Sequence, residues 1–220
     1  KSTGNAVEVT DFLSRYEADP LRYYLASIMP ETSDSEFSWE GFHAANNNEL
    51  VATFGNFVHR VLTITTRNFD DAVPTPGELD EDDKAALAAC DTALTEVAEA
   101  IEARRFRDGL QAAMRLARHG NRYVDAKEPW KLVKTDKESA ATALFVGLNI
   151  ISTLRTVFYP FLPTSADKIH GMLFTDSDTL ADGWKRREMV PGASIEKPTP
   201  LFRKLDDSII EEENSRLPAQ

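Results

Sequence analysis

Apolar residues recur every three or four positions through most of the chain, which is the spacing of one buried face of an α-helix. Stretches that contain proline or glycine interrupt the pattern. The pattern predicts a long helix over residues 40–68, a second from Asp80 to Ile101, a third that ends near Asp125 and a fourth from Glu138 to Phe158. Several long amphipathic helices joined by short connections form a bundle, so we expect an all-α fold.

Ahead of the long helices, the chain has a shorter and more polar pattern. Residues 7–29 predict two short helices with a boundary near Pro20, which suits a first helical position. The next segment is polar and turn-rich, and its Phe37/Trp39 alternation is typical of a brief strand or an extended lead-in. We assign residues 1–42 to a connecting segment of α(β) character placed before the bundle.

The chain after the fourth long helix predicts a short helix and then irregular structure. Thr164 or Ser165 could cap a helix that ends at Leu173. Beyond Phe174, proline-rich sequence predicts an extended strap, and charged residues follow as a helical stub. The bundle is therefore expected over residues 43–176, and the strap with its C-terminal helical stub over residues 177–220.

Composition excludes several classes of protein. The 220 residues are 42% hydrophobic, which suffices for one folded core with a small appendage. Cys90 is the single cysteine and the four histidines are scattered, so we expect no disulfide within the chain, no metal site and a reducing cytoplasm. No apolar run approaches the roughly 20 residues of a membrane span, and the polar start is not a signal peptide.

The charge of the chain is unevenly distributed. Twenty-five basic and 36 acidic residues give a net charge of −11, which argues against a nucleic-acid partner held by bulk electrostatics. Residues 104–122 are nevertheless rich in arginine and contain one acid, Asp108. Four of these side chains are predicted to fall near one line of a helix, namely Arg104, Arg115, Arg118 and Arg122. Both a basic binding stripe and an ordinary solvated helix face fit this pattern.

The sequence offers little that could carry out catalysis. We find no glycine-rich phosphate loop, no set of metal ligands and no nucleophile paired with a histidine base. Acidic pairs are common, but none is bracketed by apolar residues that would raise a pKa for acid or base work. We therefore expect no catalytic residue and no metal site in this chain.

Three residues are better suited to binding. Asn56 and Arg60 are four positions apart, so their side chains leave the first long helix on one side. Trp130 follows Pro129 and is predicted to lie on a stiff non-helical turn that presents its ring outward. An amide, a guanidinium and an indole supply what single-stranded bases need, which is hydrogen bonds to their edges and a platform for stacking.

Each of these residues also has a purely structural interpretation. Trp130 could be a core residue, Arg60 an ordinary surface residue, and Asn56 a means of relieving crowding in the helix. Asn121 and Asp125, also four apart, are typical of a structural polar pair and could brace the turn that carries Trp130. Spacing alone leaves these alternatives open.

Several segments resemble one known family over essentially the whole chain. KSTGN resembles the tail of the KMSKSxGN signature of class I aminoacyl-tRNA synthetases, and PFLP is also shared by several of them. YEADPLRYYL and DSEFSWEGF resemble the stretch that links the catalytic and helical domains of methionine–tRNA ligases. GNFVHR, NRYVDAKEPWKL, PFLPTSADKI and KPTPLFRKLD resemble, in order, their GNxxxR helix, NRYVDxxxPW segment, bundle-closing turn and final strap.

The resemblance implies a fold and roles for individual residues. The fold would be an anticodon-binding helix bundle preceded by a stem-contact-like connecting segment. Asn56 and Arg60 would hydrogen-bond the anticodon, and Trp130 would stack on its first base, a cytosine. Asn121, Asp125 and Pro129 would shape that pocket. Lys1 would be the second lysine of the KMSKS loop, which helps ATP during activation of the amino acid.

The resemblance also implies partners and a parent reaction. The chain would read the CAU anticodon of initiator and elongator methionine tRNAs, while a catalytic domain ahead of it uses ATP with magnesium to attach methionine. The family's zinc knob would also lie there, so we expect no cofactor in this chain and neither a membrane nor DNA as partner. The arginine stripe could contact the tRNA backbone. Two alternatives are a free-standing helical RNA-binding or assembly module without enzymatic activity, and the corresponding domain of another class I synthetase.

Overall fold

The computed structural model describes residues 7–31, 35–176, 179 and 183–216. These residues form helices and irregular segments, and the described part contains no β-strand, only an isolated antiparallel bridge between Ala72 and Ser194. The all-α expectation is confirmed. Of the two alternatives near Phe37, the brief strand is wrong, because the described chain is irregular there. The extended lead-in agrees with the structure, since Ser38 is extended and Trp39 starts a helix.

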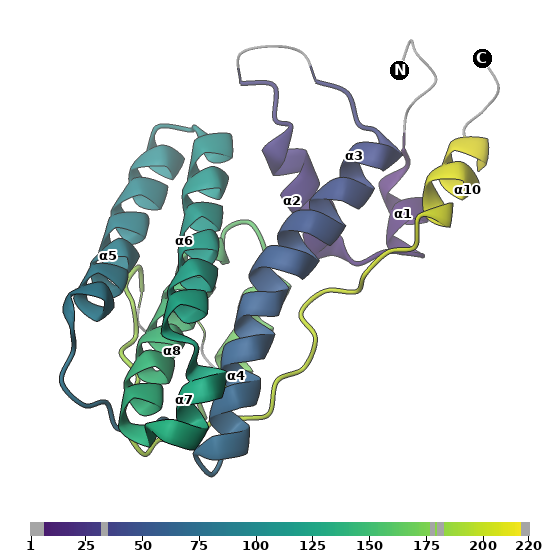
Figure 1. Cartoon of the computed structure of the whole chain (residues 1–220). Coiled ribbons are helices and arrows are strands. Elements are labelled where there is room, and N and C mark those ends of the chain that lie inside the picture. The colour runs from purple at the N-terminus through teal and green to yellow at the C-terminus, as the bar shows by residue number, and fades with distance from the viewer. Residues whose placement is uncertain (1–6, 32–34, 177–178, 180–182, 217–220) are drawn as a thin grey trace.

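The helices form a bundle with a smaller helical unit at one end (Figure 1). The connecting segment contains α1 (Val9–Leu13), α2 (Ala18–Ser27) and α3 (Trp39–Ala44). The π-helical segment η1 (Ala45–Gly55) continues into α4 (Asn56–Asn68). The bundle continues with α5 (Glu81–Glu102), α6 (Phe106–Lys127), α7 (Pro129–Thr135), α8 (Lys137–Phe158) and α9 (Pro163–Leu173). The last helix of the described residues is α10 (Ser208–Arg216).

The four long helices were predicted close to their positions, and their starts follow from side-chain caps. The Asp80 side chain caps α5 by accepting a hydrogen bond from the Asp83 N–H at 2.9 Å. The Asp83 side chain in turn accepts a hydrogen bond from the Asp80 N–H at 3.0 Å. Asp136 caps α8 in the same way through the Ser139 N–H at 3.1 Å. Such caps satisfy N–H groups that have no partner within the helix.

The first long helix is more complex than its pattern predicts. It is a continuous run in which α3, η1 and α4 follow one another, so its middle third has π-helical hydrogen bonding. Phe54, Phe57 and Val61 are fully buried on its inner side. Because α3 runs through positions 42 and 43, the predicted division between connecting segment and bundle falls within a helix. That division stays a prediction.

Helix α8 is the central helix of the bundle. It is long and apolar enough to span a membrane by length and composition, which the sequence analysis did not expect, and 94% of its apolar window is buried inside the protein. Helices α5, α6, α7 and α9 all pack against it. A helix that is apolar on every side is typical of either a membrane span or a core helix, and the surrounding helices account for the composition of α8.

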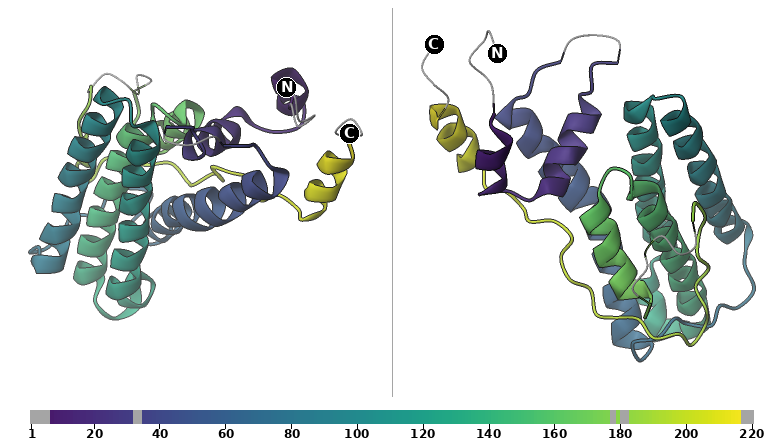
Figure 2. Two further views of the ribbon diagram at one scale, coloured as in Figure 1. Left: turned by 90° about the horizontal axis from the view of Figure 1, so that it is seen from above. Right: turned by 180° about the vertical axis from the view of Figure 1, so that it is seen from behind.

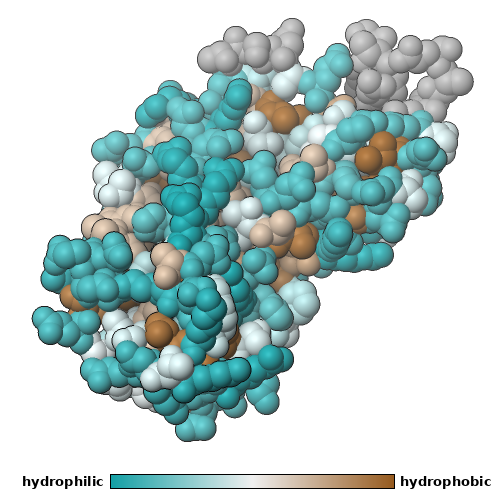
Figure 3. Space-filling model, in the orientation of Figure 1, coloured by the Kyte–Doolittle hydropathy of each residue, from teal (hydrophilic) through white to brown (hydrophobic). Residues whose placement is uncertain are grey.

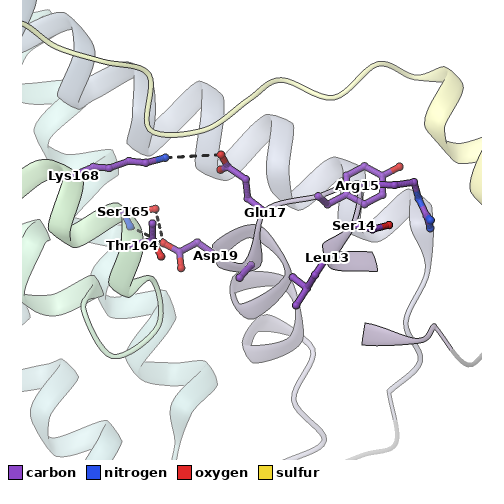
Figure 4. Close-up of a pocket in the computed structure, with 10 residues that line it drawn as sticks. Leu13, Ser14, Arg15, Glu17, Asp19, Thr164, Ser165 and Lys168 are labelled. Atoms are coloured by element: carbon purple, nitrogen blue, oxygen red, sulfur yellow. Dashed lines mark hydrogen bonds and ion pairs between the residues drawn. The ribbon is translucent and has the colours of Figure 1, made fainter. Parts of the chain in front are cut away.

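The connecting segment is joined to the bundle by polar contacts between α2 and the end of α8 and start of α9. Figure 4 shows Asp19 of α2 beside Ser165, in a cleft of about 470 Å³. The Asp19 carboxylate accepts hydrogen bonds from the Ser165 N–H at 2.6 Å and hydroxyl at 2.7 Å. The predicted cap is therefore wrong. Helix α9 begins at Pro163, and a carboxylate from a distant helix caps it.

The strap returns from the bundle to the connecting segment, as seen from behind in Figure 2. It ends in α10, which packs on α3. The Glu213 carboxylate, 3% exposed, accepts hydrogen bonds from Arg15 at 2.8 Å and from the Tyr16 hydroxyl at 2.8 Å. These contacts fix α10 beside α1, at the end of the molecule opposite α7 (Figure 1).

Candidate nucleic-acid interface

The binding residues singled out from the sequence come from three helices that meet near α7. Asn56 and Arg60 lie on α4, Asn121 and Asp125 on α6, and Trp130 on α7. Helix α4 packs against both α6 and α7, which brings these side chains together although 74 positions separate Asn56 from Trp130. The structure therefore places the five residues in one region.

Arg60 is the centre of this group. One of its guanidinium nitrogens, Nη1, donates to Asp125 Oδ1 at 2.6 Å, and Nη2 lies 3.3 Å from Asn121 Oδ1. The guanidinium carbon lies 5.4 Å from the centre of the Trp130 ring, which is cation–π distance. Its Nε is buried with no hydrogen-bond partner among the described residues. Arg60 is therefore held by three neighbours and is not an ordinary surface residue.

Asn121 and Asp125 do not brace the turn before Trp130, as the sequence suggested they could. Instead of holding the turn at Trp130, both accept hydrogen bonds from Arg60. The Asn121 amide nitrogen also donates to the Thr53 carbonyl at 2.9 Å and to the Ala117 carbonyl at 3.1 Å. Asn121 thus joins α6 to the end of η1. Thr53 contributes through its backbone, so sequence patterns had no signal by which to find it.

Trp130 lies in a helix, so the predicted non-helical turn is wrong at this position. The turn falls one residue earlier than Pro129, at Glu128, which ends α6 in the left-handed region with φ 47°. Pro129 then starts α7, where its missing N–H costs nothing. Trp130 is half-buried, with the Arg60 guanidinium over its ring, so burial does not decide between the core and platform interpretations.

Asn56, like Asp125, is exposed. It lies at the first position of α4, one helical turn before Arg60, and its side chain makes no hydrogen bond within the described part of the chain. Gly55 precedes it where η1 turns closely, since a Cβ there would lie 3.0 Å from the Leu50 carbonyl oxygen. The Asn56 amide is thus available to a ligand.

The predicted line of four arginines is wrong at one end. Arg104 lies in the turn between α5 and α6, with φ 60°, and is not on the helix. Arg115 pairs with Glu96 at 2.7 Å, and Arg118 lies 3.4 Å from Glu49. Arg122 is exposed and forms no ion pair with the described residues. Figure 3 shows a strip of strongly hydrophilic residues over α6.

The remaining expectations concern catalysis and metals. Lys1 lies outside the described residues. Across the described ranges, no group of three or more histidine, cysteine, aspartate or glutamate side chains is placed to hold a metal ion. Burial, together with the charge of Arg122, lowers the pKa of His119, which keeps this neighbour of the arginines neutral at pH 7.

Two protein families match different parts of the chain. A family described as the anticodon binding domain of methionyl tRNA ligase matches residues 73–220. A second, described as tRNA synthetases class I (M), matches residues 1–62. The helical fold and these matches place the chain among the class I aminoacyl-tRNA synthetases.

Similarity to individual proteins identifies the family within the class I synthetases to which the chain belongs. The chain is 46% identical to the methionine–tRNA ligase of Dehalococcoides mccartyi, over 99% of this chain and 39% of that protein. It is 46% identical to the enzyme of Pyrococcus abyssi, over 93% of this chain and 28% of that protein. The chain belongs to the methionine–tRNA ligase family and contains its anticodon-binding domain.

Solved structures show the same relationship in three dimensions. The methionyl-tRNA synthetase of Mycobacterium tuberculosis bound by methionyl-adenylate superposes with a TM-score of 0.87 at 28% identity, over 92% of this chain and 41% of that one. The apo form gives a TM-score of 0.83 at 26% identity, over 91% of this chain and 41% of that one. The chain thus spans about two fifths of these relatives, and a free-standing module is not favoured.

Proposed function

We propose that this chain reads the CAU anticodon of initiator and elongator methionine tRNAs through Asn56, Arg60 and Trp130. The observation that carries the proposal is the convergence of these side chains from α4 and α7, with the Arg60 guanidinium 5.4 Å from the Trp130 ring centre. An anticodon is a short unpaired loop, so its bases can be splayed out and bound one at a time.

The contacts support a different role for each of these residues. The Trp130 ring offers stacking to the first anticodon base, while Asn56 and Arg60 offer hydrogen bonds to base edges. Asp125 and Asn121 hold the guanidinium in one orientation, which lowers the entropy lost when a base binds. Pro129 fixes the start of α7 and thereby the direction of the Trp130 side chain.

The tRNA backbone is proposed to follow the arginines of α6. Arg122 is the strongest candidate for a phosphate contact because no acid of the described chain neutralises it. Arg115 and Arg118 would first have to exchange Glu96 and Glu49 for phosphate. Arg104 stays in this proposal as a contact from the turn beside α6.

The parent enzyme is proposed to attach methionine to these tRNAs in the cytoplasm, in a reaction driven by ATP with magnesium. Its catalytic domain would pack near α1, at the end of the molecule opposite α7 (Figure 1). ATP, magnesium and the zinc of the family would be held in that domain, and Lys1 would belong to its ATP-contacting loop. Neither a membrane nor DNA is part of this proposal.

Replacing Trp130 in the full-length enzyme tests the reading of the anticodon. Trp130→Ala should raise KM for methionine tRNAs by about tenfold or more, because a stacked base contributes roughly 1–3 kcal/mol. Methionine-dependent ATP–pyrophosphate exchange, which needs no tRNA, should be unchanged. Trp184→Ala is a matched control, since this strap tryptophan is 41% exposed. Loss of pyrophosphate exchange with a normal tRNA KM would contradict the proposal.

A further inference from the structure

Three consecutive asparagines in η1 make very different contacts. The Asn47 amide pairs with Leu205 of the strap in both directions, because Oδ1 accepts from the Leu205 N–H at 2.9 Å and Nδ2 donates to the Leu205 carbonyl at 2.9 Å. Asn46, 2% exposed, donates to the Arg203 carbonyl at 3.0 Å and to Asn47 Oδ1 at 2.9 Å. Asn48 is exposed, and its side chain makes no hydrogen bond within the described ranges. Asn46 and Asn47 therefore both bind the strap, and Asn47 does so with two hydrogen bonds to one residue.

The winding of η1 determines the direction of α4. The backbone is helical at both junctions, with φ −61° and ψ −45° at Ala44 and φ −62° and ψ −42° at Asn56, so no hinge separates the segments. A π-helix bonds residue i to i+5, one residue more than an α-helix. The two forms turn by different angles per residue, so a change of η1 from one form to the other would rotate the helix that follows. The orientation of Asn56 therefore depends on η1 keeping its winding.

The other end of η1 is tied to the proposed binding site. The Thr53 hydroxyl donates to the Asn48 carbonyl at 2.9 Å, a contact across five residues that spans the wide turn. The Thr53 carbonyl accepts from Asn121, whose Oδ1 lies 3.3 Å from a guanidinium nitrogen of Arg60. A chain of hydrogen bonds and helical backbone thus runs from the strap through η1 to the residues of the site.

We infer that Asn47 is a positioning residue for anticodon reading, which holds the strap on η1 and so keeps Asn56, the first residue after η1, in its place at the proposed site. The inference rests on the proposed role of Asn56. A side-chain amide can donate to a carbonyl and accept from an N–H of the same residue, whereas an ionised carboxylate can only accept. Asn47 Nδ2 also lies 2.9 Å from His43 Nε2. Aspartate at position 47 therefore loses the Nδ2 bond to the Leu205 carbonyl and places a negative charge against that carbonyl.

Two aspartate variants of the full-length enzyme separate positioning from a general effect of charge. Asn47→Asp and Asn48→Asp add the same charge at neighbouring positions of one helix. Asn47→Asp should raise KM for methionine tRNA about fivefold, with kcat and tRNA-independent pyrophosphate exchange unchanged, while Asn48→Asp should leave KM within about twofold. Equal effects of the two variants would overturn the inference. If Asn47→Asp is unfolded at the assay temperature, Asn47→Ala, which removes both bonds without adding charge, replaces it.

A double-mutant cycle with Asn56→Ala tests whether Asn47 acts through Asn56. If it does, Asn47→Asp adds nothing in the Asn56→Ala background, and the double variant has the KM of Asn56→Ala. If the KM increases of the two single variants multiply in the double variant, Asn47 acts independently of Asn56. That result overturns the inference and leaves the proposed function standing. An unchanged KM in Asn56→Ala itself overturns the proposed role of Asn56, and the inference with it.

Discussion

At the scale of single residues, Gly120 of α6 lies against the Phe57 ring of α4, one position before Asn121 of the proposed site. A Cβ at this position would lie 2.6 Å from Cζ of the buried Phe57 ring. We expect Gly120→Ala to destabilise the protein by about 1–3 kcal/mol, because the ring would have to leave its packed position.

Chemical unfolding in urea measures this change, and α9 offers a matched control. Gly171 is helical and exposed, and a Cβ added there meets no atom within 4 Å. Gly171→Ala should therefore raise stability by up to about 1 kcal/mol, as expected for glycine replacement in a helix. Equal destabilisation by both substitutions would show that the Phe57 contact is not the cause.

The sequence predicts which residues of the site share a helix face, but not how they are held. Four-residue spacing places Asn56 and Arg60 on one side of α4, as observed. The two partners that fix the Arg60 guanidinium lie on another helix, and Asn121 is itself held by the Thr53 carbonyl. A backbone carbonyl has the same chemistry at every residue, so no sequence pattern marks this contact.

At the scale of helices, the start of α5 provides a test of pH dependence. A hydrogen bond from Lys127 to Asp80, helped by the Asp83 N–H, lowers the pKa of the Asp80 carboxyl to about 2. A carboxyl with a lower pKa in the folded state stabilises that state when ionised. The contribution of Asp80 is therefore present above about pH 4 and disappears as the pH falls towards 2.

Asp80→Asn isolates the charge, because asparagine still accepts the capping hydrogen bond. We expect the variant to melt at a lower temperature than the parent chain at pH 7, with the difference shrinking steadily as the pH falls from 4 to 2. Asp82→Asn, in the same first turn but with no side-chain hydrogen bond among the described residues, should show a much smaller pH-dependent difference. A gap in melting temperature that is constant with pH would contradict this assignment.

Helical periodicity predicts the long helices well because each buries a repeating apolar stripe. It misses η1, whose winding is accompanied by contacts from Asn46 and Asn47 to a strap more than 150 positions away. It also misses α7, a short helix that starts directly after the left-handed residue Glu128. Both features depend on contacts or dihedral angles that local hydrophobicity does not encode.

At the scale of the whole molecule, the net charge of −11 bears on where RNA could be bound. Figure 3 shows a strip of strongly hydrophilic residues over α6, the helix on which Arg122 is exposed and forms no ion pair with the described residues. Glu96 and Glu49 lie beside Arg115 and Arg118 and offset their charge. Acidity elsewhere would repel tRNA that is not aligned with this strip, so contact is restricted to one face.

Arg122→Gln in the full-length enzyme tests this restriction through salt dependence. Each phosphate contact releases counterions, so its loss should reduce the slope of log affinity against log salt by about 0.7–0.9. The loss of affinity should be similar for methionine tRNAs and for tRNAs with altered anticodons, because phosphates carry no sequence information. Arg115→Gln should change the slope less, since Glu96 already engages that guanidinium at 2.7 Å. Filter binding at several salt concentrations measures both slopes, and an unchanged slope for Arg122→Gln would exclude this arginine from the tRNA contact.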